Sequence, residues 1–591
     1  MRVRRLWIQN FRGIRTLDWR IPPDQRLIAL VGPGDSGKST ILEAVHYLLG
    51  DRWNIPFADT DFYQANVESP LRIAALVMDI PAELRKDSAF GLWLSGVDAG
   101  GEFYQDPADG LDPALVVHLE VDANLEPMWS VRRADGTAHY LTASQRRAFS
   151  TFKVDDRTDA QLRWSRNSPL GRLSRKDGSE RSALAAASRA AQNAIAEQEQ
   201  SSLNDLATSV QERANRIGGG SFSDIKAGLD TSRSAMGAAL ALYEGVVPLT
   251  SYGLGSRRLA SLAIQQMAAG GRSVAVVDEI ESGLEPHRAV RLLSYLLGDE
   301  DYAQVFVTTH SPVVVEQATI ENLATVQNRD GEITVTTLGG ADEVVQRLRR
   351  SRPSSLLARR VIVAEGKTEH GLLLQLLEVF DEIRGALGQS TSAGEGVAIQ
   401  DSTGGSEVPP RAHALASLGF TVAAFCDNDD RAVDAPLADA EIAGVTAIRW
   451  EEGHSTETQV CSQLEEEGLT SLLELAVRRR DSSSTVLDDL NAAAPDAALT
   501  SLKVGDWLMF HGLSDIRSWV AQAAIKRRWF KDVHGGRDLC QWLLDRYDDP
   551  QVAATLVRLG QVLEFAYPAP PTTTQDADGE PVGPNDATAG D

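Results

Sequence analysis

The 591-residue chain has few cysteines and no long apolar segment. Its three cysteines, Cys426, Cys461 and Cys540, are too widely spaced for a disulfide framework or a cysteine metal site, which fits a reducing compartment. No apolar run approaches the ~18–20 residues of a membrane span. The basic first residues are not followed by the apolar stretch of a signal peptide. We therefore expect a cytoplasmic protein without a membrane partner.

Positive charge is also scarce, because the net charge is −25 at pH 7. This balance excludes a protein coated in positive charge for nucleic-acid binding, although local basic clusters can still contact phosphates. Each such cluster is open to two interpretations, a solvated surface or a phosphate contact. The clusters are Arg2–Arg5, Arg347–Arg360, Arg478–Arg480 and Lys526–Lys531.

The remaining composition is that of ordinary globular protein, with 43% hydrophobic residues. The length predicts about three or four domains. Residues 176–220, rich in Ala, Gln, Glu and Ser, predict a helical insertion suited to dimerisation. The charged range 346–358, which contains Pro353, is predicted to be a linker. The range 567–591, rich in Pro, Thr, Asp and Gly, is predicted to be a disordered acidic tail.

A glycine-rich loop lies between an apolar run, Leu27–Val31, and a segment with helical spacing, Ser39–Leu49. The loop matches the phosphate-binding pattern G-x-x-x-x-G-K-[ST], in which backbone N–H groups and a helix N-terminus surround phosphates. We expect Lys38 to reach the β- and γ-phosphates of ATP and Ser39 to ligate Mg²⁺. The expected nucleotide contacts are Gly32, Gly34, Asp35, Ser36, Gly37, Lys38, Ser39 and Thr40.

Two further apolar runs end in residues suited to ATP hydrolysis. Val274–Val277 leads into Asp278 and Glu279. Asp278 is expected to hold the water shell of Mg²⁺, and Glu279 to polarise the attacking water as general base. Val305–Thr308 is followed by His310, which is placed to sense the γ-phosphate.

The order of these elements resembles the ABC ATPase heads of the SMC and RecF type. The opening sequence LWIQNFRGIRTLDW is similar to their first strands, and Ser282–Pro286 resembles their D-loop. Tyr252–Arg258 resembles their signature motif, although it departs from Leu-Ser-Gly-Gly-Gln. The resemblance implies that Gly255 and Ser256 close on the nucleotide of a second subunit. Gln64 is a candidate for the Q-loop glutamine.

Acidic residues follow two apolar runs in the second half of the chain. Glu365 and Glu369 follow Val361–Ala364, and Asp427 and Asp429 follow the apolar run 420–426. In a parallel sheet the carboxyl ends of neighbouring strands meet at one crevice. Carboxylate oxygens there suit Mg²⁺ or Mn²⁺, which would activate water against a phosphodiester. The alternative interpretation is that these acids are helix caps and turn residues.

This pattern, Glu-Gly followed by Asp-x-Asp, resembles the Toprim domain. An ABC head followed by Toprim resembles the OLD (overcoming lysogenization defect) family, which includes the nuclease subunit of Gabija-type antiphage systems. The turn Thr403-Gly404-Gly405 also fits. The resemblance implies Mg²⁺, with Mn²⁺ or Ca²⁺ as alternatives, and a further metal-ligating glutamate. It also implies a lysine beside the scissile phosphate.

Two of these family residues have competing candidates in this sequence. Glu457 is the best match for the late glutamate, with Glu451 and Glu452 as competitors. Lys531 is the best match for the lysine, with Lys526 as the alternative. The metal ligands expected from the resemblance are Glu365, Glu369, Asp427, Asp429 and Glu457.

The fold expected from the sequence is therefore α/β throughout. Residues 1–175 and 221–345 would form an SMC/RecF-like ABC head, interrupted by the helical insertion, and residues 359–566 a Rossmann-like Toprim domain. The head and the insertion would build a homodimer or a tetramer. The expected activity is ATP hydrolysis together with metal-dependent nicking or double-strand cleavage of double-stranded DNA. The resemblance implies a role in phage defence or DNA processing, and it leaves open whether a helicase-like partner takes part.

Two other functions compete with this hypothesis. A RecF-like repair clamp would use the second domain for contacts and not for catalysis. A primase or topoisomerase would use the Toprim fold differently. The cysteines cannot build the zinc module usual in primases, and no separate region offers a DNA-gate tyrosine.

Overall fold

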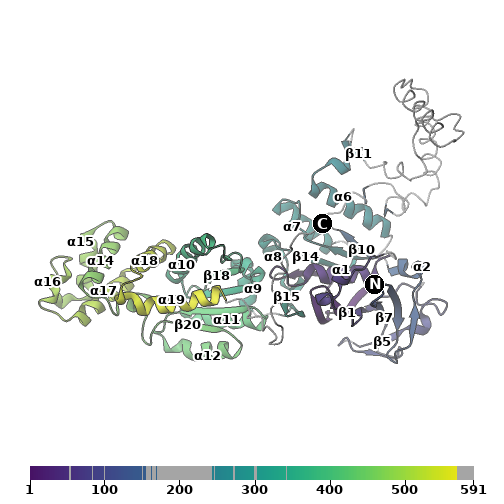
Figure 1. Ribbon diagram of the computed structural model, residues 1–591, viewed down its shortest axis with the longest axis horizontal. Coiled ribbons are helices and arrows are strands. Elements are labelled where there is room, and N and C mark those ends of the chain that lie inside the picture. Colours follow the sequence, from purple (N-terminus) through teal and green to yellow (C-terminus); the bar gives the residue numbers. More distant parts are fainter. Residues whose placement is uncertain are drawn as a thin grey trace, which may run out of the picture. The chain divides into compact units, whose positions relative to one another are not determined.

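The computed structural model divides the chain into two compact units, Met1–Ala358 and Arg359–Asp591 (Figure 1). The structure describes residues 1–51, 55–82, 84–98, 100–149, 151–154, 161–162, 168–169, 243–244, 247–269, 273–298, 302–340 and 343–568. The expected helical insertion at 176–220 lies outside the described residues. So does the expected disordered tail, apart from residues 567 and 568.

The centre of the first unit is a run of parallel strands. In spatial order these strands are β10 (Thr151–Val154), β13 (Ser273–Val277), β14 (Tyr302–Thr308), β3 (Leu27–Val31) and β15 (Leu323–Arg329). Every residue of β3, β13 and β14 is buried, as expected for strands covered on both faces. Since neighbouring strands are parallel, the loops that follow β3, β13 and β14 meet at one edge.

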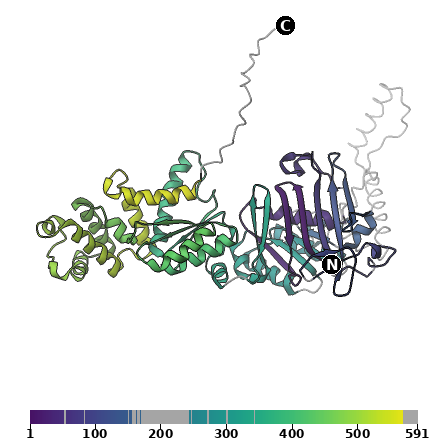
Figure 2. The same ribbon diagram turned by 90° about the horizontal axis from the view of Figure 1, so that it is seen from below.

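The same sheet continues into a mostly antiparallel half. Strand β16 (Glu332–Thr337) pairs with β15, and the order then runs through β2 (Ile14–Arg20), β1 (Arg2–Phe11), β4 (Leu71–Met78), β7 (Asp112–Val121), β5 (Ser95–Val97) and β6 (Phe103–Tyr104). Off this path, β8 (Pro127–Arg132) pairs with β7 and with β9 (Ala138–Tyr140). Figure 2 shows the purple amino-terminal strands beside a teal strand from the later part of this unit. This mixed sheet confirms the α/β class expected for the first unit and fits an ABC-type head.

The first unit also contains helices that carry the functional loops. They are α1 (Lys38–Leu49), α2 (Ala143–Arg146), α6 (Leu254–Ala269), α7 (Pro286–Gly298), α8 (Pro312–Gln317) and α9 (Glu343–Ser351). A short antiparallel pair, β11 (Tyr243–Glu244) and β12 (Val247–Pro248), precedes α6.

The range 346–358 is not an extended linker. It contains the end of α9 and a 3-10 helix, Pro353–Leu357, and it buries Leu348 and Leu356. The Arg349 guanidinium donates to the carbonyls of Glu316 and Ala318, the latter at 2.6 Å. The apolar residues of the range 346–358 lie at helical spacing and pack inward, so this charged segment belongs to the first unit. The expectation of a linker overlooked that amphipathic pattern.

The second unit begins with a four-stranded parallel sheet. Its spatial order is β18 (Val397–Asp401), β17 (Arg360–Ala364), β19 (Thr421–Cys426) and β20 (Thr446–Arg449). The connections are α10 (Lys367–Ala386), α11 (Val408–Ser417) and α12 (Asp434–Ile442). The chain moves one way from β17 to β18 and then back past β17 to β19. This reversal creates a topological switch point at the carboxyl end of β17, where α/β proteins place their ligands.

Helices cover both faces of this sheet and form most of the rest of the unit (Figures 1 and 2). They are α13 (Thr456–Cys461), α14 (Glu466–Arg480), α15 (Ser483–Ala493), α16 (Val504–Leu508), α17 (Leu513–Arg527), α18 (Val533–Leu544) and α19 (Ala553–Ala566). One continuous core joins sheet and helices, and includes the buried Phe425, Trp450 and Trp529. Helix α18 packs along α10, which brings the loop before α18 to the switch point.

No helix among the described residues is both long enough and apolar enough to cross a membrane.

Candidate functional site

The glycine-rich loop of the first unit holds a buried lysine. Lys38 is only 3% exposed, and its Nζ donates to the carbonyls of Gly32 at 3.0 Å and Pro33 at 2.6 Å and to Ser36 Oγ at 3.3 Å. Burial lowers the pKa of Lys38 to about 8, although Asp35 and Asp278 oppose this shift. No carboxylate of the described residues forms an ion pair with Lys38. A buried ammonium bound only by neutral oxygens fits an anionic phosphate as its missing partner.

A hydrogen-bond network joins this loop to the end of β13. Ser39 Oγ donates to Asp278 Oδ1 at 2.9 Å, and Thr308 Oγ1 donates to the same oxygen at 2.7 Å. The N–H of Glu279 donates to Thr308 Oγ1 at 2.7 Å. Glu279 has a φ of 46°, a left-handed conformation that is strained for a residue with a side chain. Ser39 and Asp278, the residues expected to hold Mg²⁺, are thus in direct contact, and the exposed Glu279 follows them.

Glu281 fixes the loop that carries His310. Its carboxylate accepts from Thr309 Oγ1 at 2.7 Å and from the His310 N–H at 2.5 Å. Burial and the charge of Lys38 lower the pKa of His310, so its imidazole stays neutral to a lower pH than usual. The sequence interpretation did not assign roles to Glu281, Thr308 or Thr309. In the sequence, the run of Thr and His at the end of β14 is the feature that could have indicated these roles.

The signature-like segment lies at the start of α6. Gly255 is buried against Gly283 of the same chain, so closely that a Cβ atom on Gly255 would collide with the Gly283 carbonyl oxygen. Arg258, one turn further, donates to the carbonyls of Asp278 at 2.5 Å and Ser282 at 3.3 Å. Helix α6 is therefore tied to the acidic loop after β13. The placement of Gly255 and Ser256 on a second subunit's nucleotide stays a prediction.

Gln64 lies in a short 3-10 helix, Tyr63–Ala65, with its side chain exposed. Its Nε2 contacts the hydroxyl of Tyr63 at 3.4 Å. This contact gives no support to a role for Gln64 at the phosphate loop, and the Q-loop expectation stays a prediction.

In the second unit, acidic residues converge at the switch point. Glu365 follows β17 and Asp427 follows β19, and the Asp427 N–H donates to Glu365 Oε2 at 2.8 Å. The Gly404 N–H in the turn after β18 donates to the carbonyl of Glu365 at 2.9 Å. Asp429 is exposed but close enough to contribute to a raised pKa of Glu365, of which burial is the larger cause. Three neighbouring strand ends thus meet, two of which, those before Glu365 and Asp427, the sequence predicted to do so.

Thr456 joins two of these carboxylates to the start of α13. Its Oγ1 donates to Glu369 Oε1 at 2.8 Å and lies 3.0 Å from Asp427 Oδ1. Its N–H also donates to Asp427 Oδ1 at 2.9 Å. Glu457, the next residue, is 2% exposed, and its Oε1 has no hydrogen-bond partner within the described part of the chain. Thr456 had no assigned role in the sequence interpretation.

Lys531 is a cation that lies beside this acidic cluster. Its Nζ lies 3.8 Å from Glu457 Oε1. Burial disfavours the charged amine, but attraction by Glu457, Glu369, Asp427 and Glu365 outweighs it and raises the pKa of Lys531. Burial, and then repulsion by Glu369, Glu365 and Glu457, raises the pKa of Asp427 to about 9. The site therefore holds more negative charge than one lysine balances.

The donor chemistry of this cluster fits a divalent cation, but its geometry is not a finished metal site. Within the described residues, no three His, Cys, Asp or Glu side chains are placed to hold a metal ion. Several carboxylate oxygens are instead bound by Thr456 and by the Asp427 N–H. A bound cation stabilises the charged form of buried carboxylates whose pKa values are raised. Hard oxygen ligands also suit Mg²⁺ or Mn²⁺. The residues present fit such an ion by chemistry and charge.

The competing candidates make other contacts. Glu452 is 89% exposed on its side chain and lies 4.0 Å from Arg431, while the carboxylate of Glu451 lies 3.9 Å from His454 Nδ1. Lys526 lines a separate pocket with Asp489 and Arg527. The structure therefore brings Glu457 and Lys531 to the cluster, and does not bring Glu452 or Lys526 there.

The parallel strands, the phosphate loop after β3 and the acidic loop after β13 define an ATPase domain of the AAA/ABC type, which binds nucleotide. Comparison with protein families agrees with this class. Residues 5–71 match a family model described as "AAA domain". Residues 142–316 match one described as "AAA domain, putative AbiEii toxin, Type IV TA system".

Among curated proteins, the chain is similar to the OLD nuclease of Thermus scotoductus, with 43% identity over 51 residues. The matched segment spans 9% of this chain and 9% of that protein. Solved structures to which the chain is similar include the Smc head domain from Pyrococcus furiosus, bound to the C-terminal domain of ScpA. Its identity is 12% and its TM-score 0.32, covering 59% of this chain and 99% of that one.

The recombination mediator RecF is another similar structure, with 13% identity and a TM-score of 0.32, covering 56% of this chain and 98% of that one. At such scores these likenesses support no statement about substrates or partners.

Proposed function

We propose that the chain is an ATP-regulated, metal-dependent DNA endonuclease of the OLD type, with a Toprim-type nuclease site in the second unit. The observation that carries the proposal is the convergence of four carboxylates and a lysine at the switch point of a parallel sheet. These residues are Glu365, Glu369, Asp427, Glu457 and Lys531. The short match to an OLD nuclease supports the same assignment.

In this proposal the carboxylates hold Mg²⁺, or Mn²⁺ or Ca²⁺ in its place, with the exposed Asp429 at the rim. When bound, the ion supplies an activated water and stabilises the leaving oxygen of a phosphodiester. Thr456 orients Glu369 and Asp427 toward the ion. Lys531, held beside Glu457, neutralises charge that develops on the scissile phosphate.

The ATPase domain controls this site in the proposal. Lys38 binds nucleotide phosphates, and Ser39 and Asp278 hold Mg²⁺. Glu279 orients the attacking water, and His310 senses the γ-phosphate. Gly255 and Ser256 of a second copy complete the nucleotide site, giving a homodimer or a tetramer. The substrate is double-stranded DNA. A helicase-like partner and a role in phage defence rest on the family resemblance alone.

The test is cleavage of supercoiled plasmid by the full chain with Mg²⁺ or Mn²⁺, with and without ATP. We expect nicked or linear product from the unsubstituted protein and none from the Glu365→Ala, Asp427→Ala double variant. The exposed Asp439→Ala on α12 is the matched control and should cleave normally. Failure to cleave with either metal, or cleavage by the double variant, would overturn the proposal.

The control by ATP is tested separately. Lys38→Ala should abolish ATP hydrolysis, and the exposed Lys86→Ala should leave it unchanged. Under the proposal, Lys38→Ala cleaves DNA but no longer responds to ATP. A response to ATP that survives in Lys38→Ala would contradict regulation through this site.

A second candidate is a RecF-like, ATP-dependent DNA-binding repair clamp with a non-catalytic second unit. The observation that favours it is that the described carboxylates are not arranged as a ready metal site. It predicts DNA binding that responds to ATP, no cleavage with any metal, and normal function of the Glu365→Ala, Asp427→Ala variant. The same plasmid assay separates the two candidates.

A further inference from the structure

Two basic segments that are far apart in the sequence meet at one end of the second unit. Arg478–Arg480 ends α14, and residues 526–528 end α17. Arg480 Nε and Arg527 Nε both pair with the buried carboxylate of Asp489, at 3.6 and 3.5 Å. We call Arg478, Arg480, Lys526, Arg527 and Arg528 the basic surface. All five side chains are exposed.

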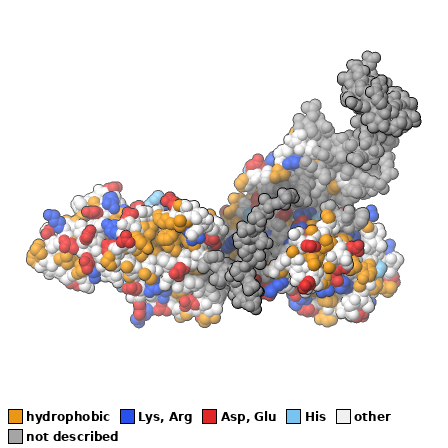
Figure 3. All heavy atoms as spheres, viewed as in Figure 1, with side chains coloured by type: hydrophobic (Ala, Val, Ile, Leu, Met, Phe, Trp, Pro, Cys, Tyr) orange, Lys and Arg blue, Asp and Glu red, His pale blue; other side chains and the backbone are white. Residues whose placement is uncertain are grey.

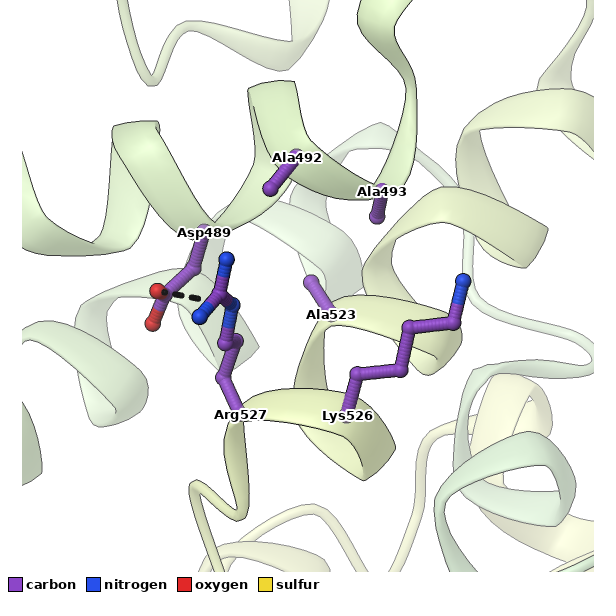
Figure 4. A pocket seen from close by; sticks show the side chains of 6 residues that line it. All are labelled: Asp489, Ala492, Ala493, Ala523, Lys526 and Arg527. Atoms are coloured by element: carbon purple, nitrogen blue, oxygen red, sulfur yellow. Dashed lines mark ion pairs between the residues drawn. The ribbon is translucent and has the colours of Figure 1, made fainter.

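A pocket of about 220 Å³ opens within this surface, between α15 and α17. Figure 4 shows Lys526 and Arg527 rising from one end of α17 on either side of Ala523, with Arg527 turned toward Asp489. Trp529 Nε1 also donates to Asp489, at 2.9 Å. The single carboxylate of the pocket is therefore already used by two guanidiniums and an indole.

Three cations of the basic surface have no carboxylate partner among the described residues. They are Arg478, Lys526 and Arg528, and Lys526 Nζ reaches only the side chain of Gln522, at 3.5 Å. On the face of the second unit shown in Figure 3, charges of both signs are otherwise interspersed. Cations at helix C-termini also balance the helix dipole. That effect does not explain why two helix ends share one acid beside an open pocket.

Residues 529–532 connect the basic surface to the acidic cluster along the chain. Arg479 Nε donates to the carbonyl of Trp529 at 3.2 Å, and Thr368 Oγ1, beside Glu369, donates to the carbonyl of Phe530 at 3.0 Å. Lys531, the next residue, lies at Glu457. The Cα atoms of Arg527 and Lys531 are at most about 14 Å apart. One DNA strand advances about 3.4 Å per phosphate, so this span covers at most about four nucleotides.

We infer that the basic surface binds the phosphodiester backbone of the DNA whose cleaved phosphate lies at the acidic cluster. The inference rests on the proposed function and adds the path of the substrate. The backbone runs from the α14 and α17 helix ends past residues 529–531. Because the chain as a whole is strongly acidic, unpaired cations here place a polyanion next to the carboxylates that would otherwise repel it.

The test is binding of a fluorescent DNA duplex to the full chain in EDTA, where metal-dependent cleavage cannot proceed, over a range of salt. Each phosphate contact contributes roughly 0.9 to the slope of log affinity against log salt. The R478E/K526E variant should therefore lower the slope by about 2. It should also bind roughly tenfold or more weakly at low salt. The gentler R478Q/K526Q variant should weaken binding in the same direction.

The matched control is K86E/K503E, which reverses two exposed cations outside the basic surface and away from the acidic cluster in the sequence. It should bind like the unsubstituted chain, and ATP hydrolysis and thermal unfolding should be unchanged in all three variants. Equal binding by R478E/K526E and the control would overturn the inference. So would absence of duplex binding by the unsubstituted chain, or binding of inorganic phosphate without the duplex.

The inference and the proposed function fail in different ways. If the unsubstituted chain cleaves plasmid and R478E/K526E binds and cleaves equally well, the nuclease stands and the inference is wrong. If duplex binding depends on the basic surface but no metal supports cleavage, the binding surface stands and the nuclease is wrong.

Discussion

The N–H of Asp427 donates a 2.8 Å hydrogen bond to Oε2 of Glu365, which lies 62 positions earlier in the chain. The bond joins the carboxyl ends of β19 and β17. It exists because the two strands are parallel neighbours in register, with Ala364 opposite Phe425. Two acids that are remote in the sequence therefore share one site.

Thr456 is expected to act as an orienting residue for the acidic cluster. Thr456→Val removes the hydroxyl that contacts Glu369 and Asp427 but keeps the shape of the side chain. Loss of such an outer hydrogen bond reduces metal affinity by about 10–100-fold. We expect a shift of that size in the Mn²⁺ concentration needed for plasmid cleavage. Thr456→Ser keeps the hydroxyl and should restore the normal requirement. An unchanged requirement in Thr456→Val would show that Thr456 does not orient ligands.

Glu281 is expected to position His310 for ATP hydrolysis. The Glu281 carboxylate accepts hydrogen bonds from two donors, and Glu281→Gln replaces this carboxylate with a neutral amide. Hydrogen bonds to charged groups contribute about 1.5–3 kcal/mol, so the rate of hydrolysis should fall by roughly 10–100-fold. Nucleotide affinity should change less than the rate, because the hydrogen bonds of Glu281 go to Thr309 and His310. Glu68→Gln, on an exposed acid outside these motifs, is the control. A loss of affinity with an unchanged kcat would contradict this role.

Nucleotide binding should take up a proton just above pH 8. Burial lowers the pKa of Lys38 to about 8 in the free protein, so part of the population is neutral there. A bound phosphate favours the charged amine and raises this pKa, so binding draws in a proton and weakens as the pH rises further. Calorimetry in two buffers of different ionisation enthalpy measures the uptake. Heats that do not depend on the buffer would contradict a buried, partly neutral Lys38.

The contact between α10 and α18 should control the position of Lys531. A Cβ atom on Gly536 would collide with the carbonyl oxygen of Thr368, and one on Gly371 with that of Val533. Gly536→Ala should reduce the free energy of unfolding by about 1–3 kcal/mol through overpacking. It should also reduce cleavage, because α18 carries the Lys531 loop against α10.

Gly560→Ala in α19 is the matched control, since an added Cβ atom there meets nothing within 4 Å. It should be neutral or stabilising by about 0.4–1 kcal/mol. Chemical denaturation measures both variants. Equal stability of Gly536→Ala and Gly560→Ala would contradict the close packing of α10 on α18.

The residues of the phosphate loop could be predicted because their function is encoded locally. A buried strand, a glycine-rich turn and a helix start in consecutive residues place Lys38 and Ser39 with little help from the rest of the chain. The same holds for acids that directly follow apolar strands, such as Asp278 and Glu365. In these cases the strand direction itself delivers the side chain to the ligand edge.

Residues that act from a distance could not be chosen from the sequence with the same certainty. Lys526 and Lys531 are five positions apart in one basic segment, yet one lines a pocket with Asp489 and the other lies at Glu457. Thr456 and Glu281 carry no motif of their own. Their roles come from hydrogen bonds to residues that are remote in the chain or on another element.

The sequence by itself therefore determined the α/β class, the ATPase motif and the acidic strand ends, because short-range spacing and strand alternation encode all three. Only the tertiary structure decided that residues 346–358 pack into the first unit and that Thr456 and Lys531 join the acidic cluster. It also decided that two basic segments share one surface. The physical reason is that these contacts depend on how helices pack, and helix packing is set by side chains far apart in the sequence.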